Sequence, residues 1–309
     1  MLSIVATLYG SAPYIDEFVR RSIASAEALA TPWEIVLVDD GSPDESLPRA
    51  RVAADRHPGV RVVELSRNFG HHRAMMIGLG QARGDRVFLI DVDLEEAPEL
   101  IGEFWTRMES DPDIDVVYGQ LSRRKGDWFE RISGDVFYSA VNRLGGVAVP
   151  RNIVTARLMS RRYVDALLEY REREIFIAGL WSATGFRQEA HHVVKAHKGE
   201  TTYNLSRKLS ILVNSITAFS DRPLRMIFFT GIGISAASGC YAAYLVVMTL
   251  SSMSPPSGWA SLIVSVWLLG GLIIFFLGVI GIYLAKIFIE VKQRPYGSIR
   301  SIYWGSDDR

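Results

Sequence analysis

The sequence predicts an α/β fold, a mostly parallel sheet with flanking helices, followed by two C-terminal transmembrane helices. Short β-rich or apolar runs alternate with stretches of helical composition over the first part of the chain, as in α/β domains. Charged residues then almost vanish between Leu224 and Ile289, where Arg225 and Lys286 are the exceptions. A soluble-like head is therefore expected before a membrane segment.

The elements of the head follow one another in a regular order. Strands are predicted at Leu2–Thr7, Glu34–Val38, Val60–Leu65, Arg86–Ile90 and Val116–Tyr118. Helices are predicted between them at Tyr14–Ala30, Ser46–Arg56, His71–Ala82 and Pro98–Met108. Because this alternation gives a mostly parallel sheet, ligands of nucleotide size are expected at the carboxyl ends of its strands.

Polar clusters lie at those strand ends. They are Thr7-Leu8-Tyr9, Asp39-Asp40-Gly41-Ser42, Ser66-Arg67-Asn68-Phe69-Gly70 and Asp91-Val92-Asp93. The Asp39-Asp40 pair has two interpretations: a tight loop with side-chain capping, or carboxylates that contact a base and a ribose. A single sheet would bring all four clusters together, which favours a binding site.

Asp91 and Asp93 can serve one cation. Side chains two residues apart in extended chain point to the same side, and Glu95 is next in the series. Carboxylate oxygens suit Mg²⁺ or Mn²⁺, which can bridge the diphosphate of a nucleotide sugar. The alternative for the tripeptide alone is a solvated turn or a cap for the helix beginning at Pro98.

Composition excludes several classes of function. Lys plus Arg equals Asp plus Glu at 34 each, which gives no argument for a nucleic-acid partner. The one cysteine, Cys240, allows neither an intrachain disulfide nor a cysteine zinc site, as expected in a reducing compartment. The sequence from Met1 lacks a basic secretory leader, so the N-terminus is expected in the cytoplasm.

The segments Leu224–Leu250 and Trp259–Ile289 exceed the roughly 20 apolar residues that a membrane helix needs. The alternative is a pair of helices buried in a large core. Basic residues flank the pair at Arg207, Lys208, Arg222, Arg225, Lys286, Lys292, Arg294 and Arg300. Head and C-terminus are therefore expected on the cytoplasmic side. Small residues between Gly231 and Gly239 suit close helix packing, in the hairpin or in a homo-oligomer.

Three motifs resemble those of a known family. They are Val38-Asp39-Asp40-Gly41-Ser42, Leu65-Ser66-Arg67-Asn68-Phe69-Gly70 and Asp91-Val92-Asp93-Leu94-Glu95-Glu96-Ala97-Pro98-Glu99. They are similar to the motifs of family 2 glycosyltransferases of the GT-A fold, in the branch of polyprenyl-phosphate glycosyltransferases. Arg157-Leu158-Met159, Gly185-Phe186-Arg187-Gln188, Lys198–Tyr203 and the two apolar spans extend this resemblance over almost the whole chain.

The resemblance implies roles for individual residues. Thr7, Tyr9 and Asp40 would contact the nucleobase, and Arg67 lies in the matching loop on the nucleotide side. Asp91, Asp93 and the Glu95 position would hold Mg²⁺ or Mn²⁺, with Asp91 and Asp93 the catalytic residues.

Four departures leave the donor sugar open. Gly10-Ser11-Ala12 replaces acidic residues, and Glu95 stands where the branch often has Gln. Thr155 occupies the place of an Asp, and His197-Lys198 that of an Arg.

The acceptor side should carry cations near the membrane. An amphipathic segment over residues 127–145, with Phe129, Ile132, Val136, Ala140 and Leu144 at helical spacing, predicts an interfacial helix or a helix docked on the head. A second such stripe falls in the juxtamembrane residues 206–222. The expected ligands of the acceptor phosphate are Arg123, Arg131 and Ser133, and Lys198 suits either phosphate. The pairs His71-His72 and His191-His192 lack the spacing of zinc enzymes and are expected in surface or packing roles.

The predicted organisation is a catalytic domain over 1–205, a juxtamembrane helix over 206–222, a hairpin over 223–290 and a cytoplasmic tail over 291–309. The predicted reaction is inverting transfer of a sugar from a UDP- or GDP-sugar to a polyprenyl phosphate, which is undecaprenyl phosphate if the source is bacterial, at the bacterial inner membrane. The first alternative is a family 2 transferase with a glycan or polysaccharide acceptor, although the Gln-x-x-Arg-Trp signature of processive synthases is missing. The second is a non-catalytic membrane scaffold.

Overall fold

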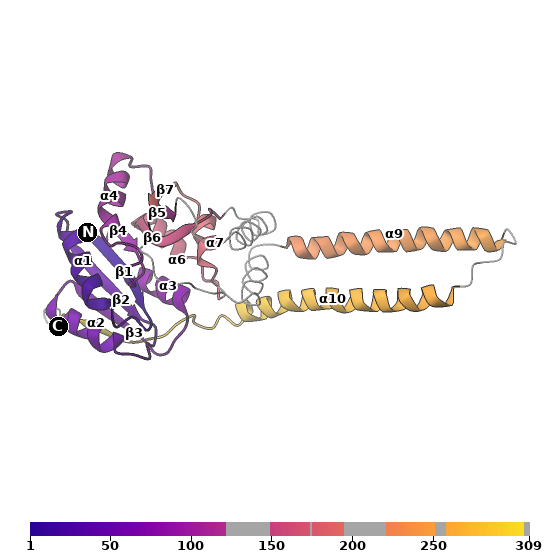
Figure 1. Cartoon of the computed structure of the whole chain (residues 1–309), viewed down its shortest axis with the longest axis horizontal. Coiled ribbons are helices and arrows are strands. Elements are labelled where there is room, and N and C mark those ends of the chain that lie inside the picture. The colour runs from indigo at the N-terminus through magenta and orange to yellow at the C-terminus, as the bar shows by residue number, and fades with distance from the viewer. Residues whose placement is uncertain (122–148, 174, 195–220, 251–257, 306–309) are drawn as a thin grey trace. The chain divides into compact units, whose positions relative to one another are not determined.

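A computed structural model describes residues 1–121, 149–173, 175–194, 221–250 and 258–305. The chain divides into two compact units. The first contains a sheet with its covering helices and takes in residues from both ends of the chain; the second contains two long helices (Figure 1).

Within the described residues, an eight-stranded mixed sheet forms the centre of the first unit. Its strands are β1 (Leu2–Leu8), β2 (Trp33–Asp39), β3 (Val60–Leu65), β4 (Arg86–Leu89), β5 (Val116–Leu121), β6 (Ile153–Ser160), β7 (Gln188–Val193) and β8 (Ile299–Trp304). Their order is β7-β5-β6-β4-β1-β2-β3-β8. The four strands β4, β1, β2 and β3 run parallel, while β6 and β8 pair antiparallel with β4 and β3.

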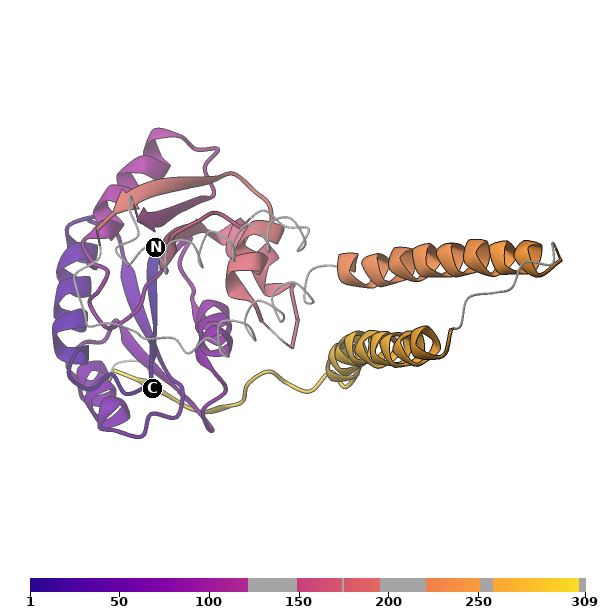
Figure 2. The same ribbon diagram turned by 45° about the vertical axis from the view of Figure 1, so that its right-hand side comes forward.

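Helices cover both faces of this sheet. They are α1 (Ile15–Glu27), α2 (Ser46–Arg56), α3 (His71–Gln81), α4 (Leu100–Ser110), α6 (Arg161–Leu168) and α7 (Ile177–Ala183). Helices α1, α2 and α4 lie on one face, and α3 and α6 lie on the other (Figure 2). Every residue of β1 is buried, as expected of a strand between two helical layers.

The fold class predicted from the sequence is confirmed. All five predicted strands and all four predicted head helices are present, and the predicted bounds of Ser46–Arg56 and Val60–Leu65 are those observed. The elements β6, α6, α7 and β7 were not predicted individually. Neither was β8, which lies within the segment 291–309 that the sequence predicted as a tail.

The second unit contains the helices α9 (Arg222–Leu250) and α10 (Trp259–Val291). Both are long and apolar enough to cross a membrane. A core helix of a soluble protein would bury its apolar residues, but in α10 the side chains of Trp267 and Ile274 are 78% and 72% exposed. This exposure favours a lipid environment over a protein core.

Candidate active site

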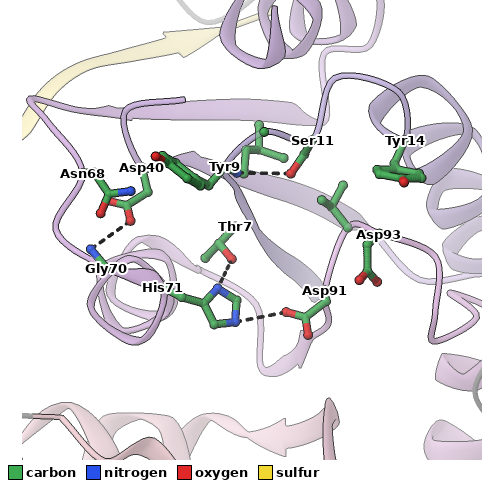
Figure 3. A pocket seen from close by; sticks show the side chains of 13 residues that line it. Thr7, Tyr9, Ser11, Tyr14, Asp40, Asn68, Gly70, His71, Asp91 and Asp93 are labelled. Carbon is green, nitrogen blue, oxygen red and sulfur yellow. Dashed lines mark hydrogen bonds and ion pairs between the residues drawn. The ribbon is translucent and has the colours of Figure 1, made fainter. Parts of the chain in front are cut away.

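A cavity of about 500 Å³ opens where the parallel strands end. Strands β1, β2 and β4 are neighbours in the sheet, so the residues that follow them lie side by side. Figure 3 shows the cavity residues. The cavity is lined by Thr7, Leu8, Tyr9, Gly10, Ser11, Tyr14, Asp40, Asn68, Gly70, His71, Asp91, Val92 and Asp93. Three carboxylates from two loops therefore face one space.

Asp40 joins two of the loops that form the cavity. Its Oδ1 accepts a hydrogen bond from Phe69 N at 2.7 Å, and its Oδ2 accepts one from Gly70 N at 2.9 Å. Burial raises the pKa of Asp40, although these two donors act in the opposite direction. The loop after β2 also approaches the loop after β3 closely, because a Cβ on Gly41 would lie 2.7 Å from Asn68 N. Asp40 thus shapes the site as well as lining it.

Asp39 has a different environment. It is buried, and its Oδ2 accepts a hydrogen bond from Ser42 N at 3.4 Å within the same turn. Burial raises the pKa of its carboxyl group. Asp39 is not among the residues that line the cavity, and its hydrogen bond with Ser42 N lies within the turn.

Asp91 contacts side chains from two other elements. His71 Nε2 lies 3.3 Å from Asp91 Oδ1, and Thr155 Oγ1 donates a hydrogen bond to Asp91 Oδ2 at 2.7 Å. The Nδ1 atom of His71 is in turn 2.9 Å from Thr7 Oγ1 (Figure 3). Withdrawal from water lowers the pKa of His71, but Asp91, Asp40 and Asp93 together outweigh that effect, so its pKa lies above the ordinary value.

The loop that carries Asp91 and Asp93 is strained. Leu94 has a φ of 61°, a left-handed conformation that costs a residue with a side chain about 1–2 kcal/mol. Asp93 Oδ1 accepts a hydrogen bond from Glu95 N at 3.0 Å, which closes the turn. The N-cap of α4 is Glu99, so neither aspartate caps that helix, and the capping alternative is excluded. Strain of this kind is often retained at functional sites.

The donor set fits Mg²⁺ or Mn²⁺. Asp91 and Asp93 offer hard oxygen atoms, and Mg²⁺ is commonly held by one or two carboxylates together with the phosphates of a substrate. No group of three His, Cys, Asp or Glu side chains in the described residues forms a preassembled metal site. The described residues that line the cavity include neither lysine nor arginine. The carboxylates of Asp91 and Asp93 would therefore repel a neighbouring diphosphate unless a cation lay between them.

Tyr9 supplies an aromatic wall. Its side chain is 57% exposed, and its backbone N donates to Ser11 Oγ at 3.1 Å. Ser11 N in turn donates to Ser46 Oγ at the start of α2, at 2.8 Å. The loop after β1 is thereby fixed to a neighbouring helix, with an aromatic ring left accessible for stacking.

Other predicted site residues lie elsewhere. The guanidinium of Arg67 lies over the Phe69 ring, 4.4 Å from its centre, and Arg67 does not line the cavity. Glu95 is also outside the lining, so it stays a predicted ligand. Arg123, Arg131, Ser133 and Lys198 fall outside the described residues, as do the segment 127–145 and most of 206–222.

Several site residues were missed from the sequence. Ser11 and Tyr14 line the cavity, and His71 does so too, although surface or packing roles were predicted for it. A usable signal for His71 was its place directly after the strand-end glycine, at the first residue of α3. By contrast His191 does pack, with Glu103 and the ring of Phe104.

Comparisons with known proteins agree with this geometry. Residues 3–168 match the family described as glycosyl transferase family 2. A relative in Mycobacterium tuberculosis (strain CDC 1551 / Oshkosh), named as a glycosyltransferase, is 49% identical over 306 residues, which cover 99% of this chain and 89% of the relative.

Two further relatives have more specific names. A prophage-derived bactoprenol glucosyl transferase of Shigella flexneri is 31% identical over 310 residues, covering 99% of both chains. The undecaprenyl-phosphate 4-deoxy-4-formamido-L-arabinose transferase of Pseudomonas paraeruginosa (strain DSM 24068 / PA7) is 32% identical over 305 residues, covering 96% of this chain and 88% of the relative. With a family match over more than half of its length, this chain belongs to glycosyl transferase family 2.

Proposed function

We propose that this protein transfers a sugar from a nucleoside diphosphate sugar, UDP- or GDP-linked, to a polyprenyl phosphate. The observation that carries the proposal is the cavity in which Tyr9, Asp40, Asp91 and Asp93 meet at the ends of parallel strands. Relatives named for bactoprenol and for undecaprenyl phosphate match nearly the whole chain, which supports the lipid acceptor.

The donor would lie with its base near Tyr9 and Asp40 and its diphosphate near Asp91 and Asp93. An exposed aromatic ring can stack on a base, and a carboxylate can accept hydrogen bonds from its edge. When bound by the two aspartates, Mg²⁺ or Mn²⁺ would neutralise the charge that develops on the departing nucleoside diphosphate.

The acceptor needs little activation. The second pKa of a phosphate monoester is about 6, so a polyprenyl phosphate is largely a dianion at neutral pH. One of its oxygens forms a bond to the anomeric carbon while the bond from that carbon to the donor diphosphate breaks. A single displacement inverts the configuration. The protein's main contributions are then positioning and electrostatic stabilisation.

The membrane hairpin supports a site at the cytoplasmic face of a bacterial inner membrane. Helices α9 and α10 suit a lipid environment, and basic residues flank both of them. In this proposal Arg123, Arg131, Ser133 and Lys198 bind the acceptor phosphate, and residues 127–145 lie at the interface. The product would serve assembly or modification of a cell-envelope glycan.

The proposal is tested with purified protein in detergent, Mn²⁺ and radiolabelled UDP- and GDP-sugars, with and without undecaprenyl phosphate. Label that moves into the organic phase when the lipid is present supports the assignment. Label that moves into a water-soluble polymer would instead support a glycan acceptor. No transfer with any donor in the panel would contradict the proposal.

Replacing Asp93 with Ala should reduce transfer to background, because the cavity loses one of its two strand-end ligands. The exposed Asp55 on α2, outside the cavity, provides a matched control as Asp55→Ala. Both variants should unfold at the wild-type temperature in detergent. Near-normal turnover by the Asp93 variant would reject the catalytic assignment in favour of a scaffold.

A further inference from the structure

Asp91 is held from two sides. On one side His71, the first residue of α3, places Nε2 at 3.3 Å from Oδ1. On the other side the hydroxyl of Thr155 on β6 donates to Oδ2 at 2.7 Å. Each oxygen of the carboxylate therefore has a partner from a different element of the fold.

The sheet explains the position of Thr155. Strands β4 and β6 are antiparallel, with Leu89 opposite Arg157. Asp91 lies two residues after Leu89, and Thr155 lies two residues before Arg157. Continuing the antiparallel register past the carboxyl end of β4 therefore places Asp91 opposite Thr155. The hydroxyl thus reaches Asp91 because of strand register, across 64 residues of sequence.

The ring of His71 is itself fixed. A carboxylate accepts hydrogen bonds and cannot donate them, so a hydrogen on Nε2 suits the contact with Asp91. In the neutral ring Nδ1 can then accept from the hydroxyl of Thr7, at 2.9 Å. Thr7 is buried on β1 and Thr155 lies on β6, so the row Thr7, His71, Asp91 and Thr155 begins and ends on a strand of the sheet.

We propose that His71 and Thr155 are positioning residues that fix the carboxylate of Asp91 for the cation and diphosphate of the donor, with Thr7 orienting His71. The inference rests on the proposed function. A carboxylate oxygen has two lone pairs, so one hydrogen bond does not exhaust its capacity as a ligand. Hydrogen bonds from outer residues commonly orient carboxylate ligands of metals in this way.

A role in holding the fold together is a poor explanation for these contacts. The side chains of His71 and Asp91 are 51% and 25% exposed, and neither residue belongs to the hydrophobic core cluster. Contacts between partly exposed polar groups contribute little to the stability of a fold. Their consequence should appear in ligand binding.

Two pairs of variants distinguish the loss of a hydrogen-bonding group from a change in side-chain shape. Thr155→Val removes the hydroxyl at nearly constant volume, whereas Thr155→Ser keeps it. His71→Leu removes the ring nitrogens, whereas His71→Gln keeps an N–H donor near the position of Nε2. Asp91→Ala is the reference for complete loss of the ligand.

The measurement is Mn²⁺ affinity of the full-length protein in detergent, from paramagnetic resonance of free Mn²⁺ in the presence of UDP or GDP, whichever the wild type binds. Thr155→Val and His71→Leu should weaken Mn²⁺ binding by about 10- to 100-fold. The Ser and Gln variants should recover most of the loss. Without ligand, all four should unfold at the wild-type temperature.

The outcomes distinguish this inference from the proposed function. If Asp91→Ala loses Mn²⁺ while Thr155→Val and His71→Leu bind it like the wild type, the positioning roles are wrong and the metal site stands. Equal losses in the Ser and Val variants, with lowered unfolding temperatures, would show a structural role and also overturn the inference. If the wild type binds neither Mn²⁺ nor nucleotide, both proposals fail.

Discussion

Asp39 and Asp40 are neighbours in the sequence but differ in what their carboxylates contact. Asp40 accepts hydrogen bonds from Phe69 N and Gly70 N and lines the cavity. Asp39 accepts a hydrogen bond from Ser42 N within the same turn. The sequence left the pair open between a capped turn and carboxylates that contact a base and a ribose, and the family resemblance implied a nucleobase contact for Asp40. Side chains that alternate along a strand point to opposite sides, which separates the two positions at the end of β2.

Asp40→Asn should weaken both the fold and nucleotide binding. The amide keeps one acceptor oxygen but turns an NH₂ group towards a backbone N–H, which leaves a donor unsatisfied. We expect a loss of about 1–3 kcal/mol in unfolding free energy and a clear rise in the Kd for UDP or GDP. Denaturant unfolding and calorimetry measure the two effects.

Asp39→Asn is the matched control. Its carboxylate does not line the cavity, so the Kd for nucleotide should stay near the wild-type value. Equal effects of the two substitutions on that Kd would place Asp39 in the binding site and contradict the separation seen here.

The row formed by Thr7, His71, Asp91 and Thr155 could be predicted from the sequence only in part. The position of Asp91 and Asp93 in the cavity was predictable because they directly follow a strand, and ligands bind at the carboxyl ends of parallel strands. Thr155 was noticed as a departure from the family pattern, yet its bond to Asp91 depends on the register between β4 and β6. No local pattern encodes that register.

At the scale of elements, the parallel strands were predictable and the antiparallel ones were not. The runs at β1 to β4 are apolar because helices cover both faces. In β6 the buried Arg157 interrupts the apolar pattern, and its guanidinium lies over the ring of Trp181. β7 has a polar sequence, because it is an edge strand, and such strands carry a weak pattern.

Strand β8 closes the opposite edge of the sheet. It pairs with β3, and Tyr303 donates a hydrogen bond from its hydroxyl to Glu64 Oε2 at 2.6 Å. Arg61 and Arg83 approach the ring of Trp304 at 4.8 and 4.5 Å. Without β8, the backbone edge of β3 would be open to pairing with another chain.

Deleting residues 298–309 should therefore destabilise the head, by about 2–4 kcal/mol from the lost burial of Tyr303 and Trp304. It should also increase aggregation during heating, because the edge of β3 becomes exposed. Thermal unfolding with light scattering measures both. Deletion of 306–309, which spares β8, is the control, and equal behaviour of the two truncations would show that β8 contributes nothing.

The ion pair between Arg21 and Glu99 connects α1 with the start of α4, with distances of 2.8 and 2.5 Å. The hydrogen bond from Arg21 lowers the pKa of Glu99 below its ordinary 4.5. A lowered carboxyl pKa stabilises the folded state above pH 4.5, and this contribution is lost as the pH falls through the folded-state pKa.

Glu99→Gln should thus lower stability at pH 7 by about 0.5 kcal/mol, a small value because the carboxylate is 54% exposed. The difference from the wild type should shrink as the pH falls below 4.5 and close once the pH is below the folded-state pKa of Glu99. Denaturant unfolding over a pH series measures it, with Glu27→Gln at the exposed end of α1 as the control. A gap that widens in acid would contradict the assigned sign.

At the scale of the whole molecule, the sheet unit draws on both ends of the chain. Strands β1 to β7 come before α9, and β8 comes after α10, so the helical hairpin is an insertion between two parts of one sheet. The sequence showed the hairpin and the charge division clearly. It did not show the insertion, because pairing between β3 and β8 joins residues more than 230 positions apart.

Because β8 follows the hairpin in the chain, a form of the protein that lacks the hairpin can either keep β8 or lose it. Replacing Arg222–Gln293 by a Gly/Ser linker of about 30 residues, with an average span of about 30 Å, keeps β8 in the chain. Ending the chain at Asp221 removes the hairpin and β8 together. The two forms therefore differ in whether the edge of β3 is covered.

The linked form should fold and bind Mn²⁺ with nucleotide within about threefold of the full-length affinity, because the cavity residues lie in the sheet unit. Its transfer to polyprenyl phosphate in vesicles should fall by about 100-fold, since the head loses the high local concentration that a membrane tether provides. The form ending at Asp221 should be less stable than the linked form. Equal stability of the two forms would show that β8 does not stabilise the head. Undiminished transfer by the linked form would show that the hairpin is not needed to reach the lipid.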